Sequence, residues 1–343
     1  MLTLRDLIIS VATFVSSGIG LLVVPLAQAQ EVCGLQAAVY DMIFANGFQP
    51  GSGTLGNPLG TVLSPTIGVT PTATITYPTA NALLSTNHTA VAGTFTGPNH
   101  VGIVVNGQTA YTFNNSFLVP DVPLSSSDPT LNLTATTLDE LNVSTSISVQ
   151  LPAQAALVRL DADASVGIAP FNIDFFLTTA PSLQVQGISI DYGDGGTFSG
   201  GGTAAIPGHT YAAPGIYVVS AMLTTISGPV SVDRRVIVLD IQDLRNRLCG
   251  VYAYLRTQLT AQDETHALQA FDPLDRTRYQ NFFTAAGQTQ LPALASELGT
   301  LAAGMVGPRE AHLTAVKTIS GVVQGYVIEF APDENGVWRI RQM

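Results

Sequence analysis

The stretch that decides the fold of this chain is Ile188–Leu223, ISIDYGDGGTFSGGGTAAIPGHTYAAPGIYVVSAML. Alternating apolar and polar residues at its start predict a strand that ends at Asp191–Gly196, where Asp and Gly accept the positive φ of a tight turn. A glycine-rich loop follows. His209–Tyr211 then leads to a second turn at Pro214–Gly215, in which we expect Pro to fix φ and Gly to take the left-handed conformation. The alternation that resumes at Tyr217 predicts another strand.

Two parts of this stretch form one pattern, YGDGG followed by HTY-x-x-PG-x-Y. The pattern resembles the signature of a PKD domain, and Gly167-x-x-Pro170 before Phe171–Phe175 is similar to the early segment of that family. The resemblance covers residues 160–240, inside a domain that we expect at 151–240, and implies a small β-sandwich of immunoglobulin type, common on the outside of cells. A mild departure is the tyrosine that precedes the turn. The motif residues, for which a structural role is implied, are Tyr192, Gly193, Asp194, Gly195, His209, Tyr211, Pro214, Gly215 and Tyr217.

The N-terminus has the pattern of a secretory signal peptide. Arg5 precedes an uncharged apolar run from Leu7 to Leu26, and the small-x-small sequence Ala27-Gln28-Ala29 follows. We therefore predict a signal peptide at residues 1–29 and an exported protein, which is periplasmic, on the outer surface or extracellular. The run is about twenty residues long, enough to span a bilayer, so an uncleaved anchor is the alternative. Two glycines and a proline in the run favour cleavage.

Residues 30–70 are rich in proline and glycine, and we interpret them as a linker-like N-terminal segment. They include Gly51-Ser52-Gly53-Thr54-Leu55-Gly56, a literal G-x-G-x-x-G. A dinucleotide site needs a strand before this motif and a helix after it, but Asn57-Pro58 follows and blocks a helix. We therefore expect a loop here and no bound cofactor.

Composition agrees with export and excludes some partners. Charged residues make up 11% of the 343-residue chain, against roughly 25% in an average soluble protein. No Lys or Arg occurs between Arg5 and Arg159, Lys317 is the single lysine, and the net charge is −11. The chain therefore has no basic surface for nucleic acid, and contact with anionic membranes beyond the signal segment is disfavoured.

The two cysteines are Cys33 and Cys249. In an oxidising compartment they can form one long-range disulfide that ties the N-terminal segment to the C-terminal region. The sequence also allows two free thiols, or a Cys33 that bridges two copies. The choice between these stays open at the level of sequence.

Residues 71–150 predict a further β-sandwich. The alternation predicts seven short strands, and Asn106-Gly107 is a strong hairpin signal. The order I-T-Y-P…V-A-G-T-F…V-V-N-G…F…V-P-L…L-x-A-T resembles bacterial Ig-like domains of the glucodextranase domain B type, which implies a spacer or contact module without catalytic residues. The predicted strands are Thr72–Tyr77, His88–Phe95, Val101–Val105, Gln108–Phe113, Ser116–Val119, Thr130–Thr136 and Val143–Gln150.

The character of the sequence changes at Ile241, where the spacing of apolar residues from Leu244 to Leu259 predicts an amphipathic helix. A helical half followed by a meander indicates a small α+β domain over residues 241–343, and the closing pattern G-Y-V-I-E-F-x-x-D-x-x-G-V-W-R-I is similar to the NTF2/cystatin-like superfamily, in which a curved sheet wraps a helix. The further predicted helices are Ala267–Phe271, Asp275–Phe283 and Leu291–Met305, and the strands are Ala311–Ile319, Val322–Ala331 and Val337–Gln342.

Few residues suggest chemistry. Asp191 and Asp194 are weak calcium candidates, but hydrogen bonds from each carboxylate to the turn backbone are the interpretation we prefer. Asp272 and Asp275 are expected to cap a helix rather than to form an acid/base pair, and the scattered histidines have no zinc-site spacing. Tyr326 and Phe330 are expected in a packed core, with a pocket wall as the alternative.

The sequence therefore predicts a mainly β protein, with two tandem immunoglobulin-like β-sandwiches followed by a small α+β domain. The predicted function is that of an exported, modular, non-enzymatic protein that contacts an extracellular protein or polysaccharide. The alternative is a C-terminal domain with a small-ligand pocket or a degenerate enzyme site. No cofactor or catalytic residue is predicted beyond the weak calcium candidates. The module set is typical of bacterial proteins, and the oligomeric state does not follow from the sequence.

Overall fold

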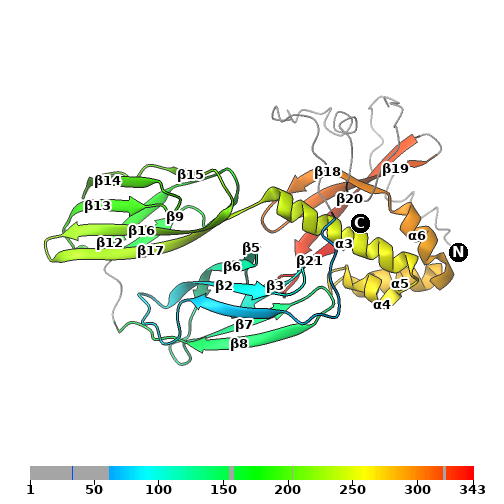
Figure 1. Cartoon of the computed structure of the whole chain (residues 1–343), viewed down its shortest axis with the longest axis horizontal. Coiled ribbons are helices and arrows are strands. Elements are labelled where there is room, and N and C mark those ends of the chain that lie inside the picture. Colours follow the sequence, from blue (N-terminus) through cyan, green and yellow to red (C-terminus); the bar gives the residue numbers. More distant parts are fainter. Residues whose placement is uncertain (1–32, 34–61, 154–157, 203, 320–321) are drawn as a thin grey trace. The chain divides into compact units, whose positions relative to one another are not determined.

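The computed structural model describes residue 33 and residues 62–153, 158–202, 204–319 and 322–343 (Figure 1). The predicted signal peptide, the glycine motif at 51–56 and most of the linker-like segment lie outside the described residues. The chain forms two compact units by its internal contacts: residues 68–241 with 334–337, and the remainder. Each is described by itself below. Strands dominate the first unit, and the second has both helices and strands, so the predicted fold class is confirmed.

The first sandwich consists of two four-stranded antiparallel sheets, with strand orders β1-β2-β6-β5 and β4-β3-β7-β8. Apolar side chains from both sheets alternate inward and form one core, which includes Val91 and Phe117 from one sheet and Ile103 and Leu131 from the other. The strands are β1 (Thr72–Tyr77), β2 (His88–Thr96), β3 (Gly102–Val105), β4 (Gln108–Thr109), β5 (Tyr111–Phe113), β6 (Ser116–Pro123), β7 (Thr130–Thr136) and β8 (Asn142–Ser148).

One predicted strand of this sandwich is wrong in an instructive way. The stretch Gln108–Phe113 is not one strand, because β4 lies in one sheet and β5 in the other. Ala110 marks the crossing, and its N–H donates to Ile103 O at 2.8 Å. The predicted hairpin at Asn106-Gly107 is confirmed: both residues have positive φ, 47° and 78°, as a type I′ turn requires, and β3 pairs with β4 across it.

The second sandwich has a five-stranded sheet in the order β10-β17-β16-β13-β14 and two two-stranded sheets, β12-β9 and β11-β15. Its core lies between them and includes Ile190, Val219 and Val236, which are buried. The strands are β9 (Val158–Ala162), β10 (Val166–Ile168), β11 (Phe171–Ile173), β12 (Phe175–Thr179), β13 (Val185–Asp191), β14 (Thr197–Gly201), β15 (His209–Tyr211), β16 (Gly215–Thr225) and β17 (Gly228–Leu239).

Two expectations about the Ile188–Leu223 stretch need correction. The glycine-rich segment is partly a strand, since Thr197–Gly201 pairs with β13 as β14. Gly215 does not have a positive φ; it begins β16 and pairs with Val238. A Cβ at Gly215 would lie 3.1 Å from the ring of Tyr217, so the position suits glycine because of this close approach and not because of a left-handed turn.

The C-terminal region combines helices with an antiparallel meander, β18-β19-β20-β21. The predicted helix Leu291–Met305 is wrong in its second half: α6 ends at Glu297, and Thr300–Val306 is strand β18. Between them Gly299 has φ +68°, the left-handed conformation that commonly ends a helix. The elements are α3 (Ile241–Thr260), α4 (Glu264–Gln269), α5 (Arg276–Ala286), the 3₁₀ helix η2 (Gln288–Gln290), α6 (Leu291–Glu297), β18 (Thr300–Val306), β19 (Ala311–Ile319), β20 (Val322–Pro332) and β21 (Trp338–Gln342).

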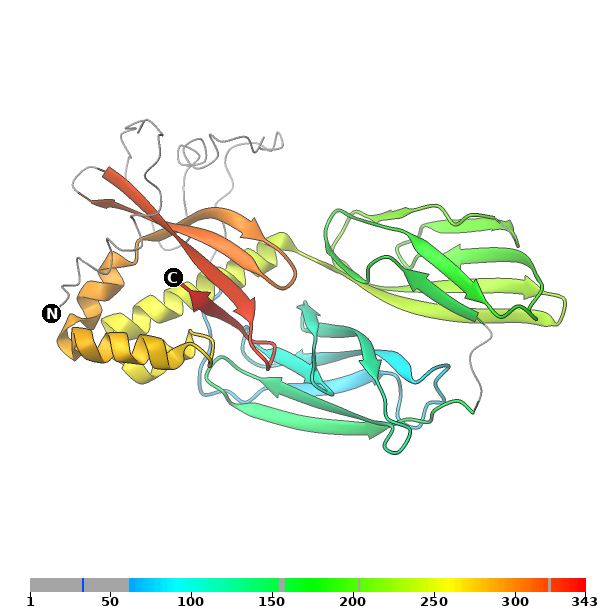
Figure 2. The ribbon, with the colours of Figure 1, turned by 180° about the vertical axis from the view of Figure 1, so that it is seen from behind.

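Helix α3 lies along the meander sheet (Figure 2). The buried side of α3 includes Leu248, Tyr252 and Leu255. Leu313 of β19 and its cross-strand partner Ile328 of β20 are fully buried as well. The sheet face next to α3 is therefore filled with packed side chains.

Among the described residues, no helix is long and apolar enough to cross a membrane.

Cys33 and Cys249 are bonded through their sulfur atoms, with their Cα atoms 5.8 Å apart. Cys249 is in the buried part of α3, and both cysteines are buried. The structure thus has the intramolecular bridge, one of the three arrangements that the sequence allows. The bond closes a loop of 216 residues in sequence separation and fixes Cys33 to the helix.

Candidate functional site

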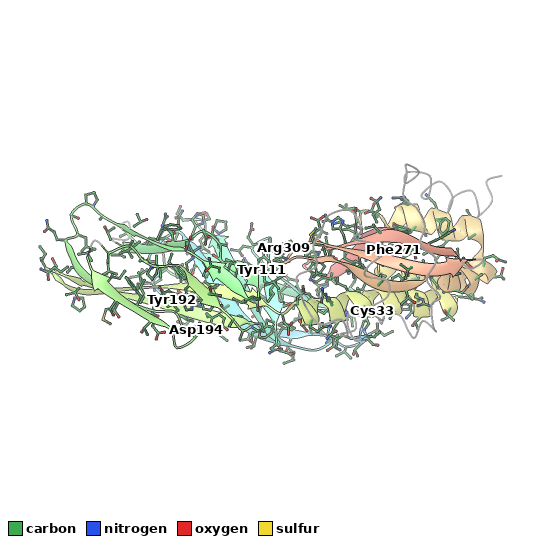
Figure 3. All side chains as sticks on the ribbon, turned by 90° about the horizontal axis from the view of Figure 1, so that it is seen from above. Cys33, Tyr111, Tyr192, Asp194, Phe271 and Arg309 are labelled. Carbon is green, nitrogen blue, oxygen red and sulfur yellow. A yellow bond between two sulfur atoms is a disulfide. The ribbon has the colours of Figure 1, made fainter. Side chains whose placement is uncertain are left out.

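The turn between β13 and β14 of the second sandwich contains four of the motif residues, Tyr192, Gly193, Asp194 and Gly195, of which Figure 3 labels Tyr192 and Asp194. Gly193 has φ +81°, and a Cβ there would lie 2.7 Å from Val218 O, so only glycine fits. The two aspartates hold the turn from either side. Asp191 Oδ1 accepts from Gly193 N–H at 2.8 Å, and Asp194 Oδ1 accepts from Gly196 N–H at 2.9 Å.

Aromatic rings connect this turn to β15 and β16. His209 stacks on Tyr192 with ring centroids 3.9 Å apart and meets Tyr211 edge-on at 4.7 Å, and Tyr211 stacks on Tyr217 at 4.3 Å. The fully buried Tyr211 donates its hydroxyl to Tyr192 O at 2.9 Å. His209 Nε2 lies 2.7 Å from Asp194 Oδ2. We call these five residues, Tyr192, Asp194, His209, Tyr211 and Tyr217, the turn cluster.

The electrostatics of the turn cluster favour a charged Asp194 and neutral tyrosines. Burial alone would raise the pKa of Asp194, but the hydrogen bond from Gly196 N–H and the hydrogen bond and charge of His209 outweigh it and hold the pKa below its usual value. Burial, helped by the nearby charge of Asp194, raises the pKa of Tyr211 well above that of a free tyrosine. Its hydroxyl is therefore a hydrogen-bond donor and not a base at neutral pH.

The calcium candidates Asp191 and Asp194 have the hydrogen bonds that we preferred for them. One oxygen of each aspartate accepts from the turn backbone, and the second oxygen of Asp194 faces His209. Within the described ranges, no three His, Cys, Asp or Glu residues are grouped as they would be to hold a metal ion. The carboxylates of the turn thus bond to the turn backbone and to His209.

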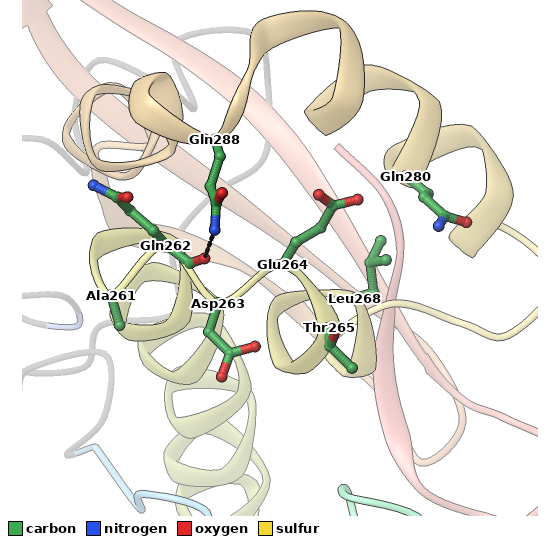
Figure 4. Close-up of a pocket in the computed structure, with 8 residues that line it drawn as sticks. All are labelled: Ala261, Gln262, Asp263, Glu264, Thr265, Leu268, Gln280 and Gln288. Carbon is green, nitrogen blue, oxygen red and sulfur yellow. Dashed lines mark hydrogen bonds between the residues drawn. The ribbon is translucent and has the colours of Figure 1, made fainter.

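The C-terminal region has an open hollow of about 690 Å³ between the end of α3, α4, α5 and η2 (Figure 4). Its walls are mostly amides and carboxylates. Gln288 Nε2 donates to Gln262 O at 3.2 Å across it. The lining residues are Ala261, Gln262, Asp263, Glu264, Thr265, Leu268, Gln280 and Gln288. This hollow lies on the helices, away from the sheet face where the pocket alternative would place it.

Asp263, on the rim of the hollow, caps the N-terminus of α4. Its Oδ1 accepts from His266 N–H at 3.0 Å, while Oδ2 lies 2.6 Å from His266 Nδ1. The backbone hydrogen bond from His266 N–H is the main reason that the pKa of Asp263 lies below its usual value; burial opposes it, and the hydrogen bond and charge of the His266 side chain add to the lowering. Both oxygens of Asp263 are therefore already engaged by His266.

Tyr326 and Phe330 belong to the packed interior of the C-terminal region. Phe330 is fully buried, and the hydroxyl of Tyr326 lies 3.3 Å from that of Tyr252 on α3, where both donate to Leu298 O. Burial raises the pKa of Tyr326 to about 12. These contacts join the helix to the sheet. The core interpretation is confirmed for the buried Phe330, whereas Tyr326 is only partly buried.

Other sequence candidates are placed as follows. Asp272 accepts from Leu274 N–H through Oδ1 at 3.0 Å and lies 3.5 Å from Arg341 Nε through Oδ2. Asp275 occupies the N-cap position of α5, but its side chain makes no capping hydrogen bond. The cap expectation for Asp275 is therefore correct in position and wrong in bonding.

Sequence reasoning missed one buried ion pair. Arg339 Nε lies 2.6 Å from Asp333 Oδ2, both side chains are 1% exposed, and the guanidinium also donates to Gln269 O. The two residues flank the turn before β21, so a signal existed: an arginine in an apolar closing strand needs an acidic partner. Nothing in the sequence pattern identified that partner, because two acidic residues, Asp333 and Glu334, precede the turn glycine.

The fold and these sites define a modular chain of immunoglobulin-like β-sandwiches with a helical and β region after them. The sequence matches no protein-family model and no curated protein. Among solved structures, the fibronectin(III)-like modules of Clostridium thermocellum CbhA have 12% identity over 50% of this chain and 95% of theirs, with a TM-score of 0.19. Dimeric latent PorU from Porphyromonas gingivalis has 12% identity over 56% of this chain and 21% of its own, with a TM-score of 0.27.

A chimeric titin Z1Z2 has 14% identity over 50% of this chain and 98% of that chain, with a TM-score of 0.20. For PorU, the part that matches this chain is only about a fifth of that protein. At these TM-scores the matches carry no argument about function, and the immunoglobulin-like assignment rests on the sheets themselves.

Proposed function

We propose that this chain is an exported, non-enzymatic interaction module whose two β-sandwiches present surfaces to an extracellular protein or polysaccharide. In this proposal the second sandwich is a PKD-type domain and the first a bacterial Ig-like domain of the glucodextranase domain B type. The C-terminal region is an NTF2/cystatin-like domain, which is consistent with its meander sheet packed on α3.

The observation that carries the proposal is the state of the turn cluster. Its two groups with acid/base potential, Asp194 and His209, are bonded to each other and to the turn, and its tyrosine hydroxyls donate to backbone carbonyls. These bonds tie the turn to β15 and close one end of the sandwich, and we assign the polar groups of the cluster a structural role in a binding scaffold.

Export is supported by the disulfide and the charge pattern. A buried long-range disulfide such as Cys33–Cys249 is typical of proteins outside the reducing cytosol. The predicted signal peptide at 1–29 supplies the route, and the acidic, lysine-poor composition excludes nucleic acid as a natural partner.

The test has two parts. The full chain is expressed with a C-terminal tag in a bacterial host, and cells are fractionated. We expect an N-terminus at Gln30 in the exported fraction and a disulfide that shifts mobility on a non-reducing gel. Recovery of the intact N-terminus in the cytosol, with both thiols reactive to maleimide, would overturn the export proposal.

The purified chain is then bound to isolated envelopes that have been treated with protease or with polysaccharide-degrading enzymes. Loss of binding after one treatment identifies the partner class. The isolated C-terminal tag serves as the control for nonspecific retention. Absence of saturable binding to untreated envelopes and to secreted polymers would contradict the interaction role.

A second candidate function is small-ligand binding by the C-terminal region, favoured by the hollow beside α4. Its amide-rich wall suits a polar, uncharged ligand such as a small saccharide, while the apolar Leu268 offers a contact for a sugar face. Calorimetric titration with a panel of neutral mono- and disaccharides tests it. Gln280→Ala is expected to weaken any such binding at least tenfold, and Gln324→Ala, at an exposed site on β20, is the matched control. No heat of binding from any sugar in the panel would remove this candidate.

A further inference from the structure

Strand β8, NVSTSIS, is an edge strand of the first sandwich (Figure 1) and lacks the usual protection against edge-to-edge pairing. It pairs with β7 along its whole length without a register shift and contains no charge and no proline. Natural sheets protect their edges with charges, prolines or bulges. The edge strand β1 of the facing sheet follows this rule, since its register shifts between Ile75 and Tyr77 and it lies between Pro71 and Pro78.

The backbone directions in β8 follow from hydrogen bonds at its C-terminal end. Val149 N–H donates toward β7, to Pro129 O at 2.9 Å, whereas Ser148 O accepts from Asn81 N–H at 2.7 Å on the opposite side. Backbone groups alternate in direction along a strand with a period of two. The odd-numbered residues of β8 therefore bond to β7, and the even-numbered residues direct their N–H and C=O groups away from the sheet.

The outward backbone groups in the middle of the strand belong to Ser144 and Ser146. Both residues are exposed, and among the described residues no backbone group bonds to theirs on the outer side. The Asn81 segment covers the strand only from Ser148 onward. The open part of the edge is therefore Val143–Ile147.

The sequence of this open edge reads almost the same in both directions, V-S-T-S-I around Thr145. A second copy that runs antiparallel with the two Thr145 residues opposite each other places Ser144 opposite Ser146. Both serines have outward backbone groups, so each such pair can exchange both of its N–H···O=C bonds. A register shifted by one residue would place outward groups opposite inward ones.

Side chains fit the same register. Val143, Thr145 and Ile147 share the face turned toward the core; Val143 and Ile147 are partly buried against it, and Thr145 is exposed. In the antiparallel pairing, Val143 lies opposite Ile147 and Thr145 opposite its own copy. These are the non-hydrogen-bonded pairs, in which side chains are closest and β-branched residues stabilise each other.

We infer that two copies of this chain associate edge to edge through β8 across a two-fold axis, so that the sheets β4-β3-β7-β8 of both copies become one continuous sheet. The same strand supplies both halves of the interface, as a two-fold symmetric dimer requires. The inference concerns self-association and stands apart from the identity of an outside partner.

Charge decides how the dimer responds to salt. Each copy has a net charge of −11, and Asp139 and Glu140 lie in the turn just before β8, whereas the edge itself has no charge. Salt screens the repulsion between copies and leaves the backbone bonds of the edge in place. Dimerisation is therefore expected to strengthen as the salt concentration rises.

The test is sedimentation velocity of the full chain over roughly 1–300 µM, a range that brackets a weak dimer with a dissociation constant of about 10–100 µM. Thr145→Lys places two like charges opposite each other and is expected to weaken association at least tenfold. Thr145→Glu is expected to do the same. An equimolar mixture of the two variants is expected to restore the dimer, because lysine then faces glutamate.

Thr224→Lys is the matched control, at an exposed threonine on β16 of the second sandwich. It makes the same change of charge on a strand that is paired on both sides, and it is expected to dimerise like the unchanged chain. Circular dichroism shows whether each variant is folded. A chain that stays monomeric up to the highest concentration and salt overturns the inference. So does a Thr145→Lys variant that dimerises normally, or a mixture that stays monomeric.

Discussion

The two sandwiches differ in how their ends and edges are held. The first relies on an apolar core shared by two four-stranded sheets, with Val91 and Leu131 fully buried, and it leaves the uncharged edge of β8 open. The second has a comparable apolar core and adds the turn cluster, in which aromatic stacking and the Asp194–His209 pair close one end. The second sandwich thus depends on specific polar and aromatic contacts at one end, whereas the first depends on the alternation of apolar residues along its strands.

This difference explains why the two are unequally visible in the sequence. The turn cluster needs particular residues at particular positions, because a ring stack and a carboxylate–imidazole bond tolerate few replacements. A packed apolar core without such polar contacts accepts many residues of similar volume. The second sandwich therefore has a specific motif, and the first has only a fold-level pattern.

The largest effect is expected from removal of the Tyr211 ring, which lies at the centre of the turn cluster. Tyr211→Ala is expected to destabilise the second sandwich by about 3–5 kcal/mol, because a fully buried aromatic side chain is lost together with its stacking on Tyr217. Hydrogen exchange measured by mass spectrometry should show lost protection in peptides from residues 158–239. Phe117→Ala, at a fully buried aromatic of the first sandwich, is the matched change and should act on residues 72–148. Loss of protection in the wrong sandwich would contradict the assignment.

A smaller effect is expected from crowding the first sandwich. A Cβ at Gly93 would lie 2.0 Å from Thr74 O and 2.5 Å from the ring of Phe117, so Gly93→Ala should cost about 2–3 kcal/mol. Gly187 in β13 of the second sandwich is the control, since its nearest neighbour would be 3.6 Å away. Gly187→Ala should change stability by no more than about 0.5 kcal/mol in thermal unfolding. Equal effects at the two glycines would show that the tight β1–β2–β6 packing is not as described.

The polar part of the turn cluster is isolated by Tyr211→Phe. This change keeps the ring but removes the hydroxyl that donates to Tyr192 O, and it leaves a buried carbonyl without that donor. The expected loss is about 1 kcal/mol, measured by denaturant unfolding beside Tyr211→Ala. Tyr217→Phe, at a partly exposed hydroxyl bonded to Ala213 O, is the control and should cost less. A loss as large as that of Tyr211→Ala would mean that the hydroxyl, and not the ring, holds the cluster together.

The smallest effect depends on pH. Because the folded-state pKa of Asp194 lies below the ordinary value of 3.8, its charge stabilises the fold above that value, and this stabilisation is lost as the pH falls through the lowered folded-state pKa. The stability of the unchanged chain should therefore fall more steeply below about pH 4 than that of Asp194→Asn. The measurement is the free energy of unfolding of each protein from pH 7 to about pH 2, and the difference between the two values at each pH. A difference that grows toward low pH would have the wrong sign for this pair.

Several local features could be predicted because neighbouring residues alone encode them. The turn at Asp191–Gly196, the type I′ hairpin at Asn106-Gly107 and helix α3 each depend on backbone dihedral requirements or on a short-range period. The bonds of Asp191 and Asp194 to their own turn are local for the same reason. The aromatic contacts of His209 with Tyr192 and Tyr211 were not predicted, because the three residues lie on separate segments that only the fold brings together.

Other features depend on partners far away in the sequence. The alternation of Gln108–Phe113 is continuous, so no local signal shows that the chain passes from one sheet to the other at Ala110. Thr197–Gly201 becomes a strand because β13 offers it a partner, and the apolar run after Gly299 becomes β18 because β19 does.

By itself the sequence determined two sandwiches, the turns at Asp191–Gly196 and Asn106-Gly107, and the amphipathic helix after them, since period and turn chemistry are properties of adjacent residues. Only the tertiary structure decided which cysteine arrangement forms, that Asp333 pairs with Arg339, and that β8 is an edge. The physical reason is that burial and strand pairing are set by the residues that fold back onto an element, and these lie tens to hundreds of positions away.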